Sequence, residues 1–331
     1  NVSSGLEPVF SFTYTRSILM PDGTRREEEV SDYALRLFRR LRALTLICAS
    51  LTGLGACAAE VGPKVQFISH LDWPPGPHRM GGFSGLELSE DGTRFTAISD
   101  RGFIVTGRLH REGPKLTAIE EDTPGPLRNA QGAPVSGLEA DSEGLAIGPD
   151  GRVHVSFEGL HRVSAYPSPD RSQPLPTVDA FDALQGNSGF EALAIDARGH
   201  LYTLPERSGR LTRPFPVWRF DGTQWTQPFS IPRSGGFLPV GADFGPDGRL
   251  YLLEREFTGF AFRSRVRRFV IAGDRISSEE TLLETPRHTH GNLEGLAVWR
   301  DATGTIRLTM LSDDNFKSFL RSEFVEYRVA D

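Results

Sequence analysis

Residues 142–158 read SEGLAIGPDGRVHVSFE, and this stretch decides the fold. Glu143 opens a short apolar run, the dipeptide Asp150-Gly151 interrupts it, and a second apolar run ends at Glu158. An Asp-Gly pair between two short apolar runs is typical of a β-hairpin. In an antiparallel hairpin, the residues before the first strand and after the second lie together, opposite the turn. The stretch therefore predicts a hairpin with two carboxylates at its open end.

The same pattern occurs five times along the chain. Its first strands begin at Phe83, Ser142, Phe190, Pro239 and Leu293, and the turns that follow lie at Asp91-Gly92, Asp150-Gly151, Arg198-Gly199, Asp247-Gly248 and Asp301–Gly304. Each second strand ends on an acid: Asp100, Glu158, Glu206, Glu254, and the pair Asp313-Asp314. Short strands and turns that repeat roughly every fifty residues indicate an all-β β-propeller.

We expect five recognisable blades, and five or six in total because Glu120–Ala140 is long enough to contain a degenerate one. The five predicted blades span residues 83–119, 144–181, 191–231, 241–283 and 293–329, and the outermost strand of the second is expected at Pro176–Phe181. The last blade lacks an outer strand, for which Val65–His70 is the candidate. Pairing of Val65–His70 with Phe324–Val329 would close the ring through the N- and C-terminal strands and remove exposed sheet edges.

The hairpins also predict where the acids meet. If each hairpin forms the inner half of a blade, the open ends converge at one mouth of the central channel. Glu143 then joins Glu158, Glu191 joins Glu206, and Glu294 joins Asp313. Close like charges repel and raise one another's pKa unless a cation lies among them, and Ca²⁺ binds about six to eight oxygen ligands in a flexible shell. The alternative is that each acid caps a strand and accepts hydrogen bonds from backbone N–H groups.

Composition restricts the function classes. The net charge of −6 argues against a nucleic-acid partner. The sequence has no Gly-x-Ser-x-Gly elbow, Walker loop or dinucleotide fingerprint, so hydrolysis would have to be metal-assisted. Both cysteines, Cys48 and Cys57, precede the predicted propeller, which therefore has no disulfide. We expect a monomer that binds a small anionic or ester substrate.

Residues 35–59 form a candidate export signal. Four arginines between Leu35 and Arg42 precede the apolar run Ala43–Ala56, which is too short for a comfortable membrane span. Leu54-Gly55-Ala56-Cys57 resembles a bacterial lipobox, in which the cysteine is lipidated; plain signal cleavage is the alternative. We expect residues 1–34 to be a non-native or disordered extension, 35–59 the signal, and 60–331 the propeller of an exported protein. That protein would lie in the periplasm or be anchored to the envelope through Cys57.

Several motifs resemble the phytase-like family of bacterial envelope proteins, which have esterase-like activity and are related to β-propeller phytases. The motifs are the recurring Glu-Gly-Leu-Ala, Ser99–Gly102 and Leu311–Phe316, and the resemblance covers Val65–Val329. It implies a propeller, export, Ca²⁺ dependence and a phosphoester or ester substrate. It also implies that the side chains that bind the metal ion are Asp100, Glu143, Glu191, Glu294, Asp313 and Asp314. The fourth blade departs from the pattern with Val240, so one ligand is lost or replaced there.

Basic residues follow the same acids. Arg101, Arg207 and Arg255 come directly after strand-ending acids, and Lys317 follows Asp314 closely. They are the candidate anion-binding residues, and the alternative is that the arginines form ion pairs between blades. The candidate catalytic residues are Glu143, Asp313 and His290, the last as a general acid or anion contact beside Asn292.

Three functions fit the sequence. The first is a Ca²⁺-dependent phosphoesterase or esterase-like hydrolase with its site at the carboxylate-ringed mouth. The second is a non-catalytic envelope binding module with structural Ca²⁺. The third is a metal-dependent lactonase, for which Asn292 and Asn315 are further oxygen ligands. A substrate-sized pocket beside the metal would favour an enzyme, whereas a channel plugged by Phe and Leu side chains would favour the binding module.

Overall fold

The computed structural model describes residues 14–19, 25–30, 64–74, 81–182, 184, 189–317 and 319–330. The chain divides into two units, Asn1–Glu60 and Val61–Asp331. In the first unit, β1 (Tyr14–Leu19) pairs antiparallel with β2 (Arg25–Val30). The predicted export signal, with Cys48 and Cys57, lies outside the described residues. Within the described part, no helix is long and apolar enough to cross a membrane.

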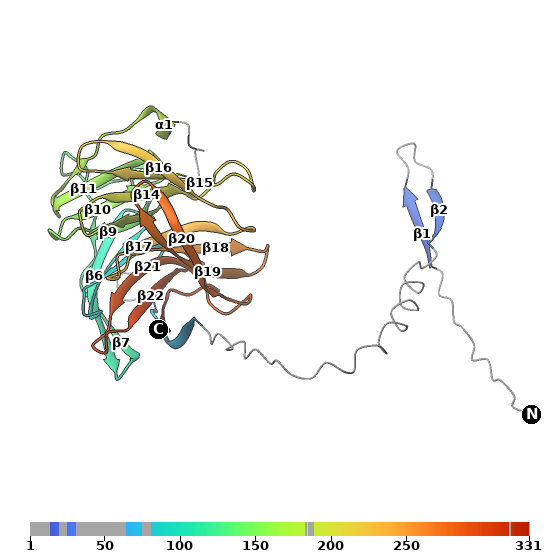
Figure 1. The fold of residues 1–331 in the computed structure, drawn as a ribbon. Helices are drawn as coiled ribbons and strands as arrows, with labels where there is room; N and C mark the ends of the chain where they lie inside the picture. Colours follow the sequence, from blue (N-terminus) through green and yellow to red (C-terminus); the bar gives the residue numbers. More distant parts are fainter. Residues whose placement is uncertain are drawn as a thin grey trace, which may run out of the picture. The chain divides into compact units, whose positions relative to one another are not determined.

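The second unit is a five-bladed β-propeller (Figure 1). The first blade contains β4 (Phe83–Leu88), β5 (Arg94–Ser99), β6 (Phe103–Glu112) and β7 (Lys115–Glu121), with β8 (Gly125–Pro126) added to β6. The second contains β9 (Ser142–Ile147), β10 (Val153–Phe157), β11 (Arg162–Ser168) and β12 (Arg171–Pro174). The third contains β13 (Phe190–Ile195), β14 (Leu201–Pro205), β15 (Phe215–Phe220) and β16 (Trp225–Ile231).

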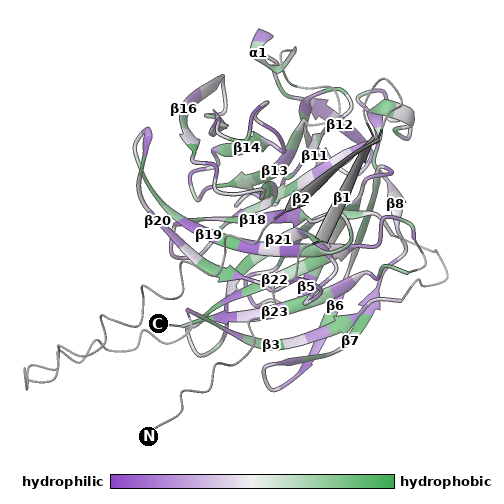
Figure 2. Cartoon of the chain, turned by 90° about the vertical axis from the view of Figure 1, so that its right-hand side faces the viewer, coloured by the Kyte–Doolittle hydropathy of each residue, from purple (hydrophilic) through white to green (hydrophobic). Residues whose placement is uncertain are grey.

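The fourth blade contains β17 (Leu238–Phe244), β18 (Leu250–Phe257), β19 (Phe262–Ala272) and β20 (Arg275–Glu284). The fifth contains β21 (Asn292–Arg300), β22 (Ile306–Asp313), β23 (Glu323–Val329) and β3 (Val65–Asp72). Every pairing is antiparallel, and the ring closes because β3 pairs with β23, beside which it lies in Figure 2. The predicted fold and its closure are confirmed.

Two details of the blade layout differ from the sequence prediction. Residues 120–140 form no sixth blade: they contain the end of β7, the short β8 and a 3₁₀ helix, Gly137–Glu139. The outer strand of the second blade is β12, and Pro176–Phe181 leads instead into the helix α1 (Asp179–Asp182). Pro174 and Pro176 cannot donate to a sheet ladder, which ends the strand there. Phe181 then packs at 4.6 Å, centroid to centroid, against Phe190 of the next blade.

The repeated Gly-Leu dipeptide packs the inner strands around the channel axis. A Cβ atom on Gly144 would lie 2.6 Å from Leu193 Cβ, and one on Gly85 would lie 2.8 Å from Leu145 Cβ. The glycine of one blade thus leaves space for the leucine of the next. This is why a small residue follows the recurring acid in each blade.

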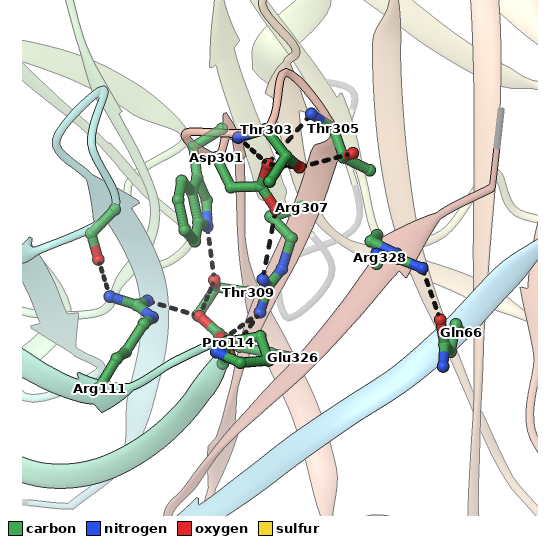
Figure 3. A network of polar contacts seen from close by, with 12 residues as sticks. Gln66, Arg111, Pro114, Asp301, Thr303, Thr305, Arg307, Thr309, Glu326 and Arg328 are labelled. Atoms are coloured by element: carbon green, nitrogen blue, oxygen red, sulfur yellow. Dashed lines mark hydrogen bonds and ion pairs between the residues drawn. The ribbon is translucent and has the colours of Figure 1, made fainter.

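A buried ion-pair network joins the first and last blades (Figure 3). Glu326 on β23 is fully buried and accepts hydrogen bonds from Arg111 at 2.6 Å, Arg307 at 2.8 Å and Thr309 at 2.9 Å. Arg111 comes from β6 and also donates to the carbonyl of Gly92 at 2.6 Å. This buried ion-pair network therefore closes the ring together with the pairing of β3 with β23.

Candidate functional site

Each innermost strand has a β-bulge, and in three of the five blades the recurring acid stands in it. In β13, Phe190 pairs with Pro205 and Ala192 with Leu204, so Glu191 has no partner on β14. The same shift occurs in β4, β9, β17 and β21. A bulge leaves one residue unpaired and re-aims its side chain. We call the five bulge side chains, one from each blade, the inner ring: Ser84, Glu143, Glu191, Val240 and Glu294.

A second set of side chains comes from the second strand of each blade, at or just beyond the end that faces the bulge. Ser99, Phe157, Pro205, Glu254 and Ser312 occupy equivalent positions, because each pairs with the residue before the bulge of its blade. The residues directly after them therefore form an outer ring: Asp100, Glu158, Glu206, Arg255 and Asp313. The predicted pairs of acids at the hairpin ends are confirmed in the second, third and fifth blades.

The fourth blade corrects the sequence interpretation by one residue. Glu254 ends the apolar run but is not a ring acid; it is fully buried and bonded to Arg265 at 2.7 Å and to Arg267 at 2.5 Å. Arg255 holds the ring position instead. In the first and third blades the acid, Asp100 or Glu206, holds the outer-ring position and an arginine follows it. In the fourth blade the arginine itself holds that position.

Asp141 is a site residue that the sequence interpretation missed. Carboxylate oxygens of Asp141, Glu143 and Glu158 lie within 4.8 Å of one another, which is close enough for one metal ion. Asp141 precedes its bulge by two residues, as Asn292 does in the fifth blade. An oxygen-bearing side chain directly before the repeated motif was therefore the sequence feature that could have identified Asp141 as a site residue.

Burial, together with electrostatic repulsion, raises the pKa of carboxyls at this mouth of the channel. Burial, followed by the charges of Glu191 and Glu294, raises the pKa of Glu143 well above its usual range. Burial and the charge of Asp313 raise the pKa of Asp100 to about 7. Burial and Asp141 do the same to the pKa of Glu158, again to about 7. These three acids are thus repelled by acids of other blades, as expected for a ring that requires a cation.

Glu143 and Glu191 lack a direct partner among the described residues, although the charge of Arg255 acts on Glu191 from a distance. Their exposed fractions are 9% and 8%, and no described residue donates a hydrogen bond or forms an ion pair with either side chain. Buried charges in proteins are normally paired or bound to a metal. The donor set around them is carboxylate oxygen without Cys or His, which suits Ca²⁺ better than Zn²⁺. The residues therefore fit the ion that the family resemblance implies.

The raised pKa values predict an unusual pH dependence. Without calcium, the folded protein keeps protons on Asp100, Glu158 and Asp313 up to about pH 7, whereas an unfolded carboxyl releases its proton near pH 4. The free energy of unfolding therefore falls as pH rises from about 4 to 7. We expect a melting temperature at least about 5 °C lower at pH 8 than at pH 5 in chelator. Excess calcium favours the ionised carboxylates and should therefore reduce this difference in melting temperature. Thermal melts of the wild-type protein and of Glu143→Gln at both pH values measure it.

The predicted anion-binding residues do not form one cluster. Arg255 lies in the outer ring, where it donates to Glu206 at 3.1 Å and to Asn292 at 2.9 Å and pairs with Glu294. Arg101 stacks on the Phe316 ring, with its guanidinium 3.4 Å from the centroid. Arg207 bonds Glu206 at 3.0 Å and its side chain is 56% exposed, and Lys317 is exposed near Phe319. Ion pairing between blades, the alternative considered for the arginines, is found for Arg255, whereas Arg207 pairs within its own blade.

The turn after β22 explains the most specific motif of the chain. Asn315 and Phe316 both have positive φ, 49° and 52°. The Asn315 N–H donates to Asp313 at 2.7 Å, and the Phe316 N–H donates to Asp314 at 2.9 Å. Asp314 also accepts the Gly82 N–H at 3.1 Å, so it ties two loops together and is not placed like the ring acids. The strained turn fixes Asp313 in the ring and supplies the Phe316 platform under Arg101.

Gly82 offers a test of this loop packing. Its φ is +67°, and a Cβ there would collide with Asp100 and with the Phe316 ring. Gly113 is a matched control, since its φ is +58° and a Cβ there would have no atom within 4 Å. We expect Gly113→Ala to cost about 1–2 kcal/mol from backbone strain alone, and Gly82→Ala to cost a further 1–3 kcal/mol, roughly, from overpacking. Urea unfolding of both variants measures the difference, and equal losses would contradict the proposed packing.

His290 is placed away from its predicted partners. Its ring nitrogen Nε2 lies 2.7 Å from the Tyr327 hydroxyl, and the ring stacks on Phe67 at 6.2 Å. Both partners belong to β23 and β3, the outer strands of the fifth blade. Burial and the neighbouring His70 lower the pKa of His290 to about 4, which leaves it neutral near pH 7. The sequence placed it at the mouth from its proximity to Asn292, but the chain reaches the inner strand only after Gly291.

The channel below the rings is closed. Leu86, Leu145, Leu193 and Leu296 surround a cavity of about 10 Å³, which is no larger than a single water position. Any ligand of the ring acids must therefore arrive from the mouth itself. Leucine side chains thus fill the channel centre among the described residues, which is close to the plug of Phe and Leu that we associated with a binding module.

Several solved structures are similar to this chain at low sequence identity. The aldose sugar dehydrogenase of Streptomyces coelicolor in its PQQ-bound form matches at 13% identity and a TM-score of 0.45, over 80% of this chain and 98% of the other. A gluconolactonase of Xanthomonas campestris matches at 14% identity and a TM-score of 0.43, over 74% of this chain and 76% of the other. Virginiamycin B lyase of Staphylococcus aureus matches at 12% identity and a TM-score of 0.39, over 80% and 100%. With values this low, the three likenesses carry no argument about activity.

The sequence itself gives the more specific result. No match to a curated protein was found. The family model described as phytase-like, with esterase-like activity of phytase, matches residues 78–316. This range contains both rings and the turn after β22, and it covers well over half of the 331 residues. The chain therefore belongs to the phytase-like family.

Proposed function

We propose that this protein is a calcium-dependent ester hydrolase whose site is the acidic mouth of the propeller. One observation carries the proposal: Glu143 and Glu191 are more than nine-tenths buried, lie among other acids, and have no partner among the described residues. A cation is the simplest complement to such an arrangement. Membership of a family with esterase-like activity supports ester hydrolysis as the reaction.

The ion would be held mainly by the second blade. Asp141, Glu143 and Glu158 form its tightest oxygen cluster, and Glu191 faces Glu143 from the next blade. When bound, Ca²⁺ would polarise the ester group and balance the negative charge that develops as the ester bond breaks.

We assign Asp313 the role of general base. Its carboxylate is fixed by the Asn315 N–H at 2.7 Å and lies near the Asn292 amide at 3.4 Å. Burial and the charge of Glu294 raise the pKa of Asp313 to about 7, in the range where a carboxylate accepts a proton from water efficiently. His290 has no part in this assignment because its contacts lie on the outer strands.

The rim favours a substrate of low charge. Arg255 is engaged by Glu206, Glu294 and Asn292, and Arg101 lies on Phe316. Arg101, Arg207 and Lys317 are exposed. These few exposed cations, beside a ring of carboxylates, suit a small ester with one anionic group better than a highly phosphorylated molecule such as phytate.

Hydrolysis assays test this proposal. The full-length protein would be supplied with an aryl phosphate, phytate, an aryl acetate and a simple lactone, each with calcium and with chelator. We expect calcium-dependent release from at least one monoester, greater than from phytate. If calcium raises the melting temperature but no ester is turned over, the ion is structural. The closed channel specifically favours that second candidate, an envelope binding module.

We also propose export, from the basic and apolar order of residues 35–59, with lipidation of Cys57. In a bacterial host fed radioactive palmitate, label should enter the wild-type protein and the Cys48→Ser control. It should be absent from Cys57→Ser. Label retained in Cys57→Ser would exclude an anchor at this position.

A further inference from the structure

The fourth blade brings a positive charge to a site that is otherwise acidic. It contributes Val240 to the inner ring and Arg255 to the outer ring, whereas the second, third and fifth blades contribute an acid to both. The first blade contributes Ser84 and Asp100. Arg255 is the one basic residue within the two rings.

The contacts of Arg255 reach the blades on both sides. Its Nη2 donates to Glu206 Oε1 of the third blade at 3.1 Å. Its Nη1 donates to Asn292 Oδ1 of the fifth blade at 2.9 Å and to Glu294 Oε1. The side chain is only 19% exposed. Arg255 thus binds oxygen atoms from three residues, which is what a metal ion at this position would do.

The two halves of the site consequently differ. Glu206 and Glu294, on the side of the fourth blade, have a guanidinium partner. Asp141 and Glu143, in the second blade, receive no hydrogen bond or ion pair from any described residue, and Glu158 receives only the Gly189 N–H at 3.2 Å. A largely buried guanidinium contacts the acids of one half, and no described basic side chain does so in the other.

We propose that Arg255 is a resident cation that takes the place of a second metal ion. It restricts the mouth to one divalent ion, held by the half that contains Asp141, Glu143 and Glu158. This inference rests on the proposed calcium site and concerns how many ions it takes, independently of any hydrolysis. Arg255 is accordingly a positioning residue, and the anion contact predicted from the sequence is not its role.

Calcium stoichiometry tests the proposal, measured by calorimetric titration and equilibrium dialysis on the full chain. We expect one ion per wild-type chain and two for Arg255→Glu, which replaces the guanidinium with another carboxylate beside Glu206 and Glu294. Arg255→Lys should keep one ion. Arg207→Gln is the matched control, because Arg207 also bonds Glu206 but lies outside the rings, and it should keep one ion.

Arg255→Gln provides a second readout if Arg255→Glu does not fold. Removing the guanidinium leaves Glu206 and Glu294 uncompensated, so calcium should raise its melting temperature more than that of the wild-type protein. Two ions in the wild-type chain, an unchanged single ion in a folded Arg255→Glu, or an unchanged calcium shift in Arg255→Gln would each overturn the proposal. Wild-type protein that binds one ion but hydrolyses no ester would refute the proposed function alone.

Discussion

Replacing Glu143 with glutamine is expected to abolish calcium-dependent turnover while raising the melting temperature of the calcium-free protein. The variant loses a metal ligand, which should lower turnover at least about 100-fold. It also loses a carboxyl that must take up a proton on folding, because burial and the charges of Glu191 and Glu294 raise the pKa of Glu143. We expect a rise of roughly 2–4 °C in chelator, equivalent to about 1 kcal/mol. A purely structural glutamate would lower stability when replaced.

The control is another carboxyl on an inner strand, the half-buried Glu87. Glu87 lies near the opposite end of β4, accepts the Ile147 N–H at 3.2 Å and is repelled by Asp243. Glu87→Gln should leave the calcium dependence of turnover and of melting intact. If Glu143→Gln keeps wild-type turnover with calcium, or melts lower without it, the ring is not a metal site of the kind proposed.

The largest loss of stability is expected from Glu326→Ala, in the buried ion-pair network between the first and last blades. Glu326 is fully buried and holds Arg111 and Arg307, whose side chains are 12% and 2% exposed. Glu326→Ala would leave both guanidinium groups without their main partner. Breaking a buried ion pair from one side costs about 3–5 kcal/mol, and we expect a loss in this range.

Urea unfolding at fixed calcium measures this loss. The matched control is Glu120→Ala, since Glu120 also pairs with a basic side chain, His110, at 3.1 Å, but both are largely exposed. An exposed pair contributes about 1 kcal/mol or less. A loss below about 1 kcal/mol for Glu326→Ala would show that β3 pairing alone closes the ring.

The sequence predicted the architecture because its signals are local. Asp-Gly turns and short apolar runs specify hairpins whatever surrounds them, and the repeat then specifies a ring of blades. The recurring Glu-Gly-Leu proves to serve three ends: the acid occupies a bulge, the glycine allows the neighbouring strand to approach, and the leucine closes the channel. Periodicity reveals such a motif without revealing these separate roles.

The parts that were missed depend on register and on tertiary contacts. Glu254 and Arg255 differ by one position, and only the pairing of Glu254 with Pro239 shows which of them faces the ring. A one-residue shift moves a side chain to the other face of a sheet. His290 was assigned from its distance along the chain to Asn292, which says nothing about the Tyr327 and Phe67 side chains that it contacts.

A calcium titration of the wild-type chain and of the double variant Glu143→Gln/Glu191→Gln is the sharpest test of a calcium site at the ring acids. These two buried acids have no hydrogen-bond or ion-pair partner among the described residues, so we expect a bound cation to compensate their charge. We expect saturable binding of one ion to the wild-type protein, with a clear rise in melting temperature, and neither in the double variant. Absence of binding at millimolar calcium, or equal binding by both proteins, would contradict the account.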